Sequence, residues 1–541
     1  MNKTTFVLSL LLGSLALSPI HESRASSSER STPLCSGYCA DTCDGERFAR
    51  IQKRLHKWED SSMGLIFDCF SGKPLILMDD EAWDAKLLNH PNPDDARFEM
   101  RTRGYVQDAD SFYAIKPSYV PTDVPIPSDF MGKLRQNLPP HNTYVLSQGL
   151  NVLDLMSWAA GGYQRNFSSS VPDKVFPNLV VGEENATRVE EARRLGRMTN
   201  MYRDLIGTSL NQFTPRDGAA LMGDLGSRFG ASVKTVDDKR ILHDRFQMLW
   251  EVGRGSDLLP NVTTLEWTPR DGVEPRMSLH LVGKGVCFDT GGHNIKHEPS
   301  SQATMYGDKG GALAQIMLAR MIMEANLPIA LTVSNGWVVN TPGPQAQMQS
   351  DIYELFVGTA ENGNTDAEGR LVMGAILNSA RESKPFDVTI TMATLTGAAL
   401  VAVGQNTGII HAKGSDPVTP FLVDGTKRVH DPVRHLGIDP RNLELLKAGT
   451  TRADVRTTGG SYGGSSTADA FLRWIATAPI KTEPKDTPVT QFVHYDIACA
   501  GAGSTGLTPG VKDMDMFAVR GAFEGLKNYL EKFPALASSS S

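Results

Sequence analysis

Five stretches, given in chain order, decide the fold: SLHLVGKGVCF (278–288), GGALAQIMLARMIMEA (310–325), IALTVSNGWVV (329–339), GRLVMGAILNSARES (369–383) and DVTITMATL (387–395). The first, third and fifth are apolar, strand-like runs, and the two between them have a helical pattern. Strand–helix alternation with buried-looking strands predicts an α/β fold with a mostly parallel central sheet covered by helices. Ligands of such sheets usually bind at the carboxyl ends of the strands.

The chain is long enough for more than one domain, because 541 residues exceed a typical single domain. We predict a larger catalytic α/β domain over 195–535, preceded by an N-terminal α/β domain over 26–190 with a cysteine-containing start. The N-terminal part is irregular, with clusters such as HPNPDD (90–95) between short extended runs such as NTYVLSQGLNVLDLM (142–156). A helical pattern with three-to-four spacing then begins near Val189 and stops at Gly207.

The charge balance argues against nucleic acid as a partner. Lys and Arg number 54 against 61 Asp and Glu, a formal charge of −7. A mildly acidic chain with no long basic block does not attract nucleic acid or anionic membrane through its overall field.

The first 25 residues read as a signal peptide. Lys3 precedes the apolar run VLSLLLGSLAL (7–17), and a small-residue stop follows near Ala25. The run is shorter than the ~20 apolar residues that span a bilayer. We therefore predict a secreted protein with no membrane contact beyond this segment; an uncleaved anchor is the alternative.

Cysteines form two groups. Behind a signal peptide, the first four would form two disulfides, with a metal knuckle as the less favoured alternative because no histidine has suitable spacing: Cys35, Cys39, Cys43 and Cys69. The last two, Cys287 and Cys499, lie in apolar surroundings and are expected to be buried free thiols.

Acidic and basic residues gather among glycines in VGKGVCFDTGGHNIK (282–296), MYGDKGGA (305–312) and NTDAEGRL (364–371). If 364–368 is extended, Asp366 and Glu368 face the same side, which is costly unless a cation lies between them. The alternative interpretation of this segment is an acidic turn that caps a helix.

The charges of the three segments favour a two-metal site. Two divalent ions would neutralise four carboxylates, those of Asp289, Asp308, Asp366 and Glu368. Lys296 and Arg370 would remain to bind developing negative charge, as in two-metal hydrolases. Oxygen-rich sites suit Zn²⁺, Mn²⁺ or Mg²⁺. A lysine inside such a cluster, such as Lys284, is either a cationic salt-bridge partner or a neutral amine ligand.

NTDAEGRL, together with GKGVCFDTGGHNIK (283–296) and MYGD (305–308), resembles the motifs of the leucyl aminopeptidase family of the cytosol aminopeptidase type. The similarity extends over roughly 195–535. It implies a metal-dependent aminopeptidase that releases N-terminal residues from peptides, with a leucine-type preference. It also implies two divalent ions per chain (Zn or Mn), bicarbonate as general base, and a homo-hexamer.

The resemblance also implies roles for individual residues. The metal-binding positions would be Lys284, Asp289, Asp308, Asp366 and Glu368. Asp289 and Glu368 match the bridging ligands, Asp366 would belong to one metal, and Lys284 with Asp308 to the other.

The remaining implied roles concern the substrate. Lys296 matches the lysine that polarises the scissile carbonyl or stabilises the tetrahedral intermediate. Arg370 matches the arginine that holds bicarbonate, with the Leu395 backbone beside it. The pocket for the first side chain would be lined by Met305, Thr394 and Gly397.

Departures from the family pattern are few. Lys309 stands where a methionine often follows the aspartate, and one extra residue lies between Lys296 and Met305. The family pattern does not require His293, His297 or His494, which we interpret as structural or surface residues.

Two other kinds of protein compete with the enzyme. A catalytically silent homologue with a structural or binding role would have lost a ligand position, and all five are present here. The absence of a basic stripe and the predicted export both weigh against a DNA-binding or regulatory role. No P-loop motif supports a nucleotide enzyme.

Overall fold

The structure is a computed structural model of the chain. It describes residues 186–532 except 298–301, 384, 430, 481–488 and 502–515. Of the first 185 residues it describes only short segments, which leave the apolar run 7–17 and the first four cysteines outside. Among the residues that are described, no helix is both long enough and apolar enough to cross a membrane.

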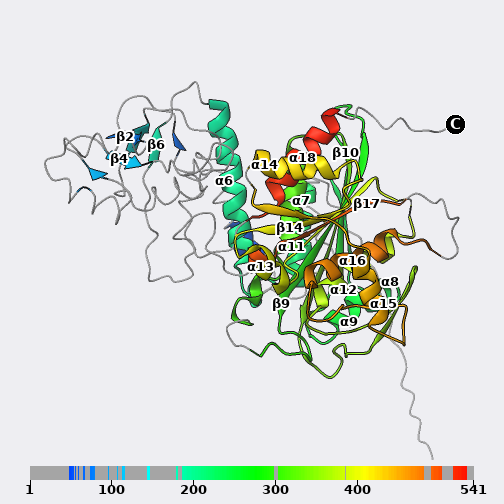
Figure 1. Ribbon diagram of the computed structural model, residues 1–541. Helices are drawn as coiled ribbons and strands as arrows, with labels where there is room; N and C mark the ends of the chain where they lie inside the picture. The colour runs from blue at the N-terminus through cyan, green and yellow to red at the C-terminus, as the bar shows by residue number, and fades with distance from the viewer. Residues whose placement is uncertain are drawn as a thin grey trace, which may run out of the picture. The chain divides into compact units, whose positions relative to one another are not determined.

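A twisted eight-stranded sheet lies at the centre of the C-terminal part (Figure 1). Its strands, in spatial order, are β15 (Val433–Leu436), β14 (Gly408–Ala412), β17 (Gln491–Asp496), β13 (Val388–Ala393), β9 (Met277–Asp289), β10 (Ile329–Asn340), β8 (Asn261–Trp267) and β7 (Ser232–Val236). The four strands β17, β13, β9 and β10 run parallel to one another. This confirms the predicted α/β fold with a parallel centre. Antiparallel pairings flank that centre, between β10 and β8, β8 and β7, and β14 and β17.

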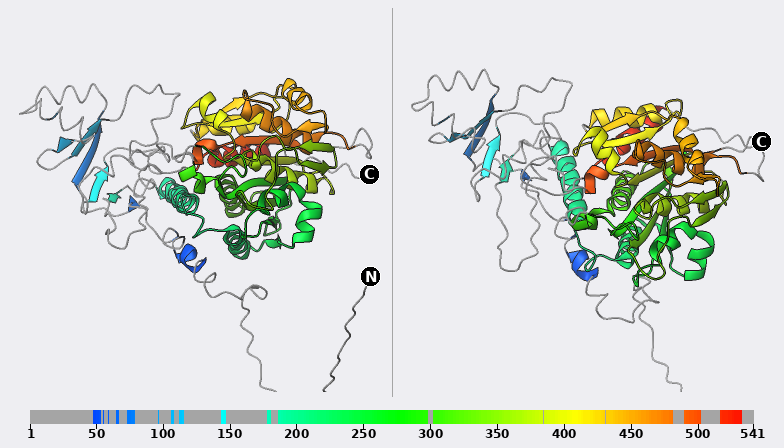
Figure 2. Two further views of the ribbon diagram at one scale, coloured as in Figure 1. Left: turned by 90° about the horizontal axis from the view of Figure 1, so that it is seen from below. Right: turned by 60° about the horizontal axis from the view of Figure 1, so that its bottom comes forward.

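Helices cover both faces of this sheet (Figure 2). On one face lie α7 (Pro215–Phe229), α11 (Gly310–Glu324), α14 (Thr419–Arg428) and α18 (Val519–Lys532), with α6 (Ala186–Ile206) packed on α11. On the other lie α9 (Gln247–Gly253), α12 (Glu368–Ala380) and α16 (Gly464–Thr477), joined by α8 (Lys239–Arg245) and α15 (Arg441–Ala448). Each layer has its own hydrophobic core, so the central strands are buried on both sides, including polar residues that interrupt their apolar runs, such as His280 and Asn335.

Shorter elements connect these layers. They are η2 (Met305–Gly307), α13 (Gly397–Val403), α17 (Ala498–Gly501), and a three-stranded sheet of β11 (Ile352–Leu355), β12 (Gly358–Glu361) and β16 (Val455–Arg456).

The helix boundaries follow local chemistry. The helix predicted from the pattern at Val189 is confirmed as α6, which ends one residue before Gly207. α7 begins at Pro215 behind a capping box of Thr214 and Asp217. Such a box satisfies free N–H groups of the first turn.

The N-terminal segments include a second sheet. Its strands, in spatial order, are β1 (Leu65–Ile66), β6 (Asn178–Val180), β5 (Thr143–Leu146), β2 (Lys73–Met78), β4 (Phe112–Ile115) and β3 (Val106–Gln107). All pairings are parallel except that of β3 with β4. The predicted extended run at 142–156 contains β5, while the domain boundaries stay predictions.

Candidate metal centre

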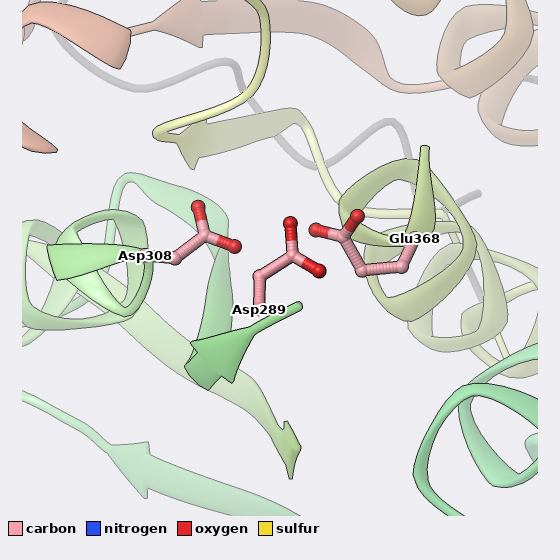
Figure 3. Close-up of side chains that lie close together, drawn as sticks. All are labelled: Asp289, Asp308 and Glu368. Atoms are coloured by element: carbon pink, nitrogen blue, oxygen red, sulfur yellow. The ribbon is translucent and has the colours of Figure 1, made fainter. Parts of the chain in front are cut away.

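Three buried carboxylates meet at the carboxyl end of the parallel strands (Figure 3). Asp289 ends β9, Asp308 follows η2 at the start of α11, and Glu368 is the first residue of α12. One oxygen from each lies within 4.8 Å of the others, and each residue is at most 6% exposed. Segments up to 79 residues apart in the chain therefore present acidic side chains to one point.

Two lysines bind these carboxylates. Lys284 Nζ lies 2.8 Å from Asp308 Oδ1 and 2.8 Å from Glu368 Oε1. Lys296 Nζ lies 2.9 Å from Asp289 Oδ2 and 2.5 Å from Asp366 Oδ1. The two ammonium groups thus connect all four acidic residues singled out from the sequence.

Burial and neighbouring charge act in opposite directions on the lysines. Burial alone would lower the pKa of Lys284, but the carboxylates of Asp308, Glu368 and Asp289 raise it above its usual value. The pKa of Lys296 is raised in the same way, against burial, by Asp289, Glu368 and Asp366. Without a bound cation both lysines are therefore charged.

The carboxylates do not share the negative charge equally. Burial, together with repulsion from Glu368, raises the pKa of Asp289 to about 7. Burial also raises the pKa of Asp308, well above its usual range. The pKa of Glu368 is lowered, because Lys284 and Lys296 outweigh its burial.

The donor set fits divalent cations. Four ionised carboxylates against two ammonium groups would carry a charge of −2, and the raised pKa values of Asp289 and Asp308 reflect how costly this charge is in a buried cluster without a further cation. Asp308 Oδ2 is buried and has no hydrogen-bond partner among the described residues. Carboxylate oxygens with a lysine amine and a free lone pair suit Zn²⁺ or Mn²⁺.

Close backbone approach shapes the cluster at Gly369. A Cβ on Gly369 would lie 2.5 Å from Lys284 Cδ, so any side chain there would displace the Lys284 side chain or the first turn of α12. Two hydrogen bonds fix the orientation of the Asp289 carboxylate: Asn340 Nδ2 and the Gly291 N–H donate to its Oδ1 at 2.7 and 2.8 Å. Its Oδ2 is thereby turned toward the cluster.

The expectation that 364–368 is extended is wrong. Asp366 lies in a turn, and Glu368 already belongs to α12. The Asn364 side chain accepts a hydrogen bond from the Asp366 N–H at 2.9 Å, which favours a turn over a strand. Asp366 is not one of the three converging carboxylates and has 31% of its side chain exposed, but it contacts the cluster through both Lys296 and the Asp289 carboxyl group.

Arg370 lies in the first turn of α12, as predicted, and is 5% exposed. Its Nη1 donates to the Thr457 carbonyl at 2.8 Å, while its Nε has no hydrogen-bond partner among the described residues. Burial lowers the pKa of the guanidinium to about 10, so it remains charged at neutral pH. A buried guanidinium whose donors are not all paired could bind an anion.

The predicted pocket residues surround the loop after β13. Thr394 is buried, and its hydroxyl donates to Asp308 Oδ1 at 3.0 Å. Met305 is half-buried at the start of η2. Gly397 is exposed, and a Cβ at this position would meet no described atom within 4 Å. The Leu395 N–H donates to Asp496 Oδ1 at 3.2 Å.

The other singled-out side chains lie apart from the three carboxylates. His293 and His297 are exposed, and His494 is buried with its Nδ1 2.8 Å from Thr391 Oγ1. Cys287 and Cys499 are buried free thiols, as expected. Sequence reasoning missed Asn340 and Asp496; the only signal was a polar residue at the end of each apolar strand.

Two relatives named as probable cytosol aminopeptidases are similar to more than half of the chain. A probable cytosol aminopeptidase of Aquifex aeolicus is 35% identical over 314 residues, 57% of this chain and 60% of the relative. A second, of Corynebacterium glutamicum, is 31% identical over 372 residues, 67% of this chain and 70% of the relative. The chain thus spans about 60% of the length of the Aquifex relative.

These names correct the prediction of export. Both relatives are named for the cytosol, so the predicted signal peptide and secretion are not supported. An apolar run of eleven residues carried that prediction, and a run of this length is also typical of a helix in a protein core. The disulfide prediction depended on the same assumption, because cytosolic thiols stay reduced, and its cysteines lie outside the described residues.

The structural comparison and the family model agree with the motifs. The crystal structure of the cytosol aminopeptidase of Coxiella burnetii is similar with a TM-score of 0.70 and 25% identity, covering 87% of this chain and 99% of that one. The model of the cytosol aminopeptidase family, catalytic domain, matches residues 200–521, which include every residue of the cluster. The chain therefore belongs to the cytosol aminopeptidase family.

Proposed function

We propose that this protein is a metal-dependent aminopeptidase that releases N-terminal residues from peptides with the help of two divalent cations, Zn²⁺ or Mn²⁺. The observation that carries the proposal is the convergence of three buried carboxylates with two lysines at the end of the parallel sheet. We assign the cations to Lys284, Asp289, Asp308, Asp366 and Glu368, with Asp289 and Glu368 as bridges. The relatives' name also favours a cytosolic enzyme.

Two divalent cations in this cluster would supply a Lewis acid for the scissile carbonyl and lower the pKa of the attacking water. Lys284 must give up its proton to become a ligand, since metal ligands bind deprotonated. Its carboxylate partners, Asp308 and Glu368, would then turn toward a cation instead of an ammonium group.

Lys296 and Arg370 have different roles in this proposal. Lys296 is half-buried and paired with Asp289 and Asp366; if cations compensated those carboxylates, its ammonium group would be available to the substrate. It would then donate to the oxygen that becomes negative in the tetrahedral intermediate. Arg370, charged and incompletely paired, would hold bicarbonate, which takes a proton from the attacking water.

The substrate's first side chain would lie against Met305, Thr394 and Gly397. The family resemblance favours an apolar side chain of leucine size at these residues. A homo-hexamer stays a prediction from the family resemblance, to be checked by sedimentation.

The test is reconstitution of metal-free protein with Zn²⁺, Mn²⁺ or Co²⁺, followed by assay on a panel of aminoacyl amides. We expect hydrolysis only after metal addition, fastest on leucine-type substrates. Binding of two cations without hydrolysis of any amide would instead favour the catalytically silent homologue.

A further inference from the structure

Asp496 holds the loop after β13 through several hydrogen bonds. It ends β17 in register with Ala393, the last residue of β13, and is fully buried. Its Oδ1 accepts from the N–H groups of Leu395 (3.2 Å), Thr396 (3.3 Å) and Ala498 (3.3 Å). Its Oδ2 accepts from Thr396 Oγ1 at 2.6 Å. One carboxylate therefore fixes two consecutive backbone amides and a side chain of the loop.

The same loop also forms hydrogen bonds with the cluster of carboxylates and lysines, through Thr394. The Thr394 carbonyl accepts from Lys284 Nζ at 2.9 Å, and Thr394 Oγ1 donates to Asp308 Oδ1 at 3.0 Å. Residues 394–396 thus lie between Asp496 and two of the assigned metal ligands. A shift of the loop would move the hydrogen-bonding partners of both Lys284 and Asp308.

We propose that Asp496 is a positioning residue, which holds residues 394–396 so that Thr394 orients Lys284 and Asp308 for the cation they share. This inference rests on the proposed function for the identity of the metal site. A carboxylate suits the task, because hydrogen bonds to a charged acceptor are stronger than those to a neutral one. Outer partners that orient metal ligands typically change metal affinity 10- to 100-fold when they are removed.

Asp431 provides a matched control. It is also a buried aspartate, and it accepts from the N–H groups of Ala518 and Gly521 at 3.0 Å each, at the start of α18. Replacing it should therefore loosen backbone in the same way without releasing residues 394–396.

The experiment compares Asp496→Ala, Asp496→Asn and Asp431→Ala in the full chain by two measurements. Hydrogen exchange of the metal-free protein reports on residues 394–398, and calorimetric titration with Mn²⁺ reports on metal affinity. For Asp496→Ala we expect faster exchange at 394–398 and about 10- to 100-fold weaker binding of one of the two ions. Asp496→Asn, which keeps an acceptor, should lie between it and the wild type. Asp431→Ala should bind Mn²⁺ like the wild type.

Unchanged exchange at 394–398, or wild-type Mn²⁺ affinity in Asp496→Ala, would overturn the inference. If that variant does not fold, Asp496→Asn and Thr396→Val take its place, and wild-type affinity in both would overturn it equally. A wild-type protein that binds no Mn²⁺, Zn²⁺ or Co²⁺ would contradict the proposed function instead. The exchange measurement would still decide whether Asp496 holds the loop.

Discussion

Strand β9 buries ionisable side chains to the same depth near its start and toward its end, but their charge states differ. His280, near the start of the strand, is 3% exposed, as is Lys284, and Asp289 at its end is 2% exposed. Among the described residues, the partners of His280 are neutral: its Nε2 lies 3.0 Å from Ser334 Oγ, and its ring stacks on Phe386. Burial lowers the pKa of His280 to about 3, so it is neutral. Lys284 stays charged because carboxylates surround it.

Depth of burial therefore does not decide the charge state of a side chain in this sheet; the charge of its partners does. The start of β9 packs like any protein core, whereas its end holds opposed charges whose desolvation is only partly repaid by their attraction. The following predictions test that difference, from the largest expected effect to the smallest.

Asp289→Ala should have the largest effect. Removing one of the two proposed bridging carboxylates would leave Glu368 as the only shared ligand, with less negative charge between the two cations. Metal content should fall to one ion or none per chain, and peptide hydrolysis should be almost lost. Elemental analysis and kinetics on the same preparation check this, and two tightly retained ions per chain would contradict the assignment.

Lys284→Met should strongly destabilise the metal-free protein. The change removes the cation between Asp308 and Glu368 and leaves their buried carboxylates uncompensated. Breaking a buried ion pair from one side typically lowers the free energy of unfolding by about 3–5 kcal/mol. Urea denaturation measures it, with Lys234→Met as the control, because Lys234 is an exposed lysine of the same sheet. Equal stability of the two variants would mean that the charges at this end of β9 are not coupled.

Lys296→Ala distinguishes between two possible roles of Lys296, a catalytic role and a structural role in salt bridges. Loss of one preorganised donor to an oxyanion typically lowers kcat by about 10²–10³. If Lys296 acts in this way, metal content should stay near that of the wild type while kcat falls. Loss of metal in step with activity would indicate that Lys296 only supports the acidic cluster.

Arg370→Ala complements that variant. It should lower the rate at ambient bicarbonate and weaken the response to added bicarbonate, because the buried guanidinium is proposed to hold that anion. An unchanged bicarbonate response would contradict this role.

The sequence predicted the parallel centre of the fold, because apolar strands and helices with three-to-four spacing are local patterns. It did not predict the antiparallel edges, since the direction of β8 or β14 depends on pairing with distant strands. The sequence left the turn at Asp366 open as an alternative to an extended segment, and the hydrogen bond from the Asp366 N–H to Asn364 Oδ1 favours the turn.

In the candidate site, too, residues within local motifs were predicted, and residues that depend on long-range contacts were not. The motifs supplied Lys284, Asp289, Asp308 and Glu368, and the structure brings these residues into one cluster. Asp496 carries no such signal, because its partner Leu395 lies 101 residues away in the chain. Contacts of this kind arise only when parallel strands place their ends together.

His280→Gln tests the neutral end of β9 and should have the smallest effect. An unfolded histidine titrates near pH 6.5, whereas folded His280 does so at about 3. Between these values the unfolded chain binds more protons, so wild-type stability falls as the pH is lowered through this window. The loss specific to His280 should approach about 1.4 kcal/mol per pH unit. Glutamine does not titrate, so in urea denaturation at pH 7, 6 and 5 the wild type should lose stability more steeply than the variant. Parallel curves would mean that His280 is protonated inside the folded protein, and that burial without a charged partner does not keep a side chain of this sheet neutral.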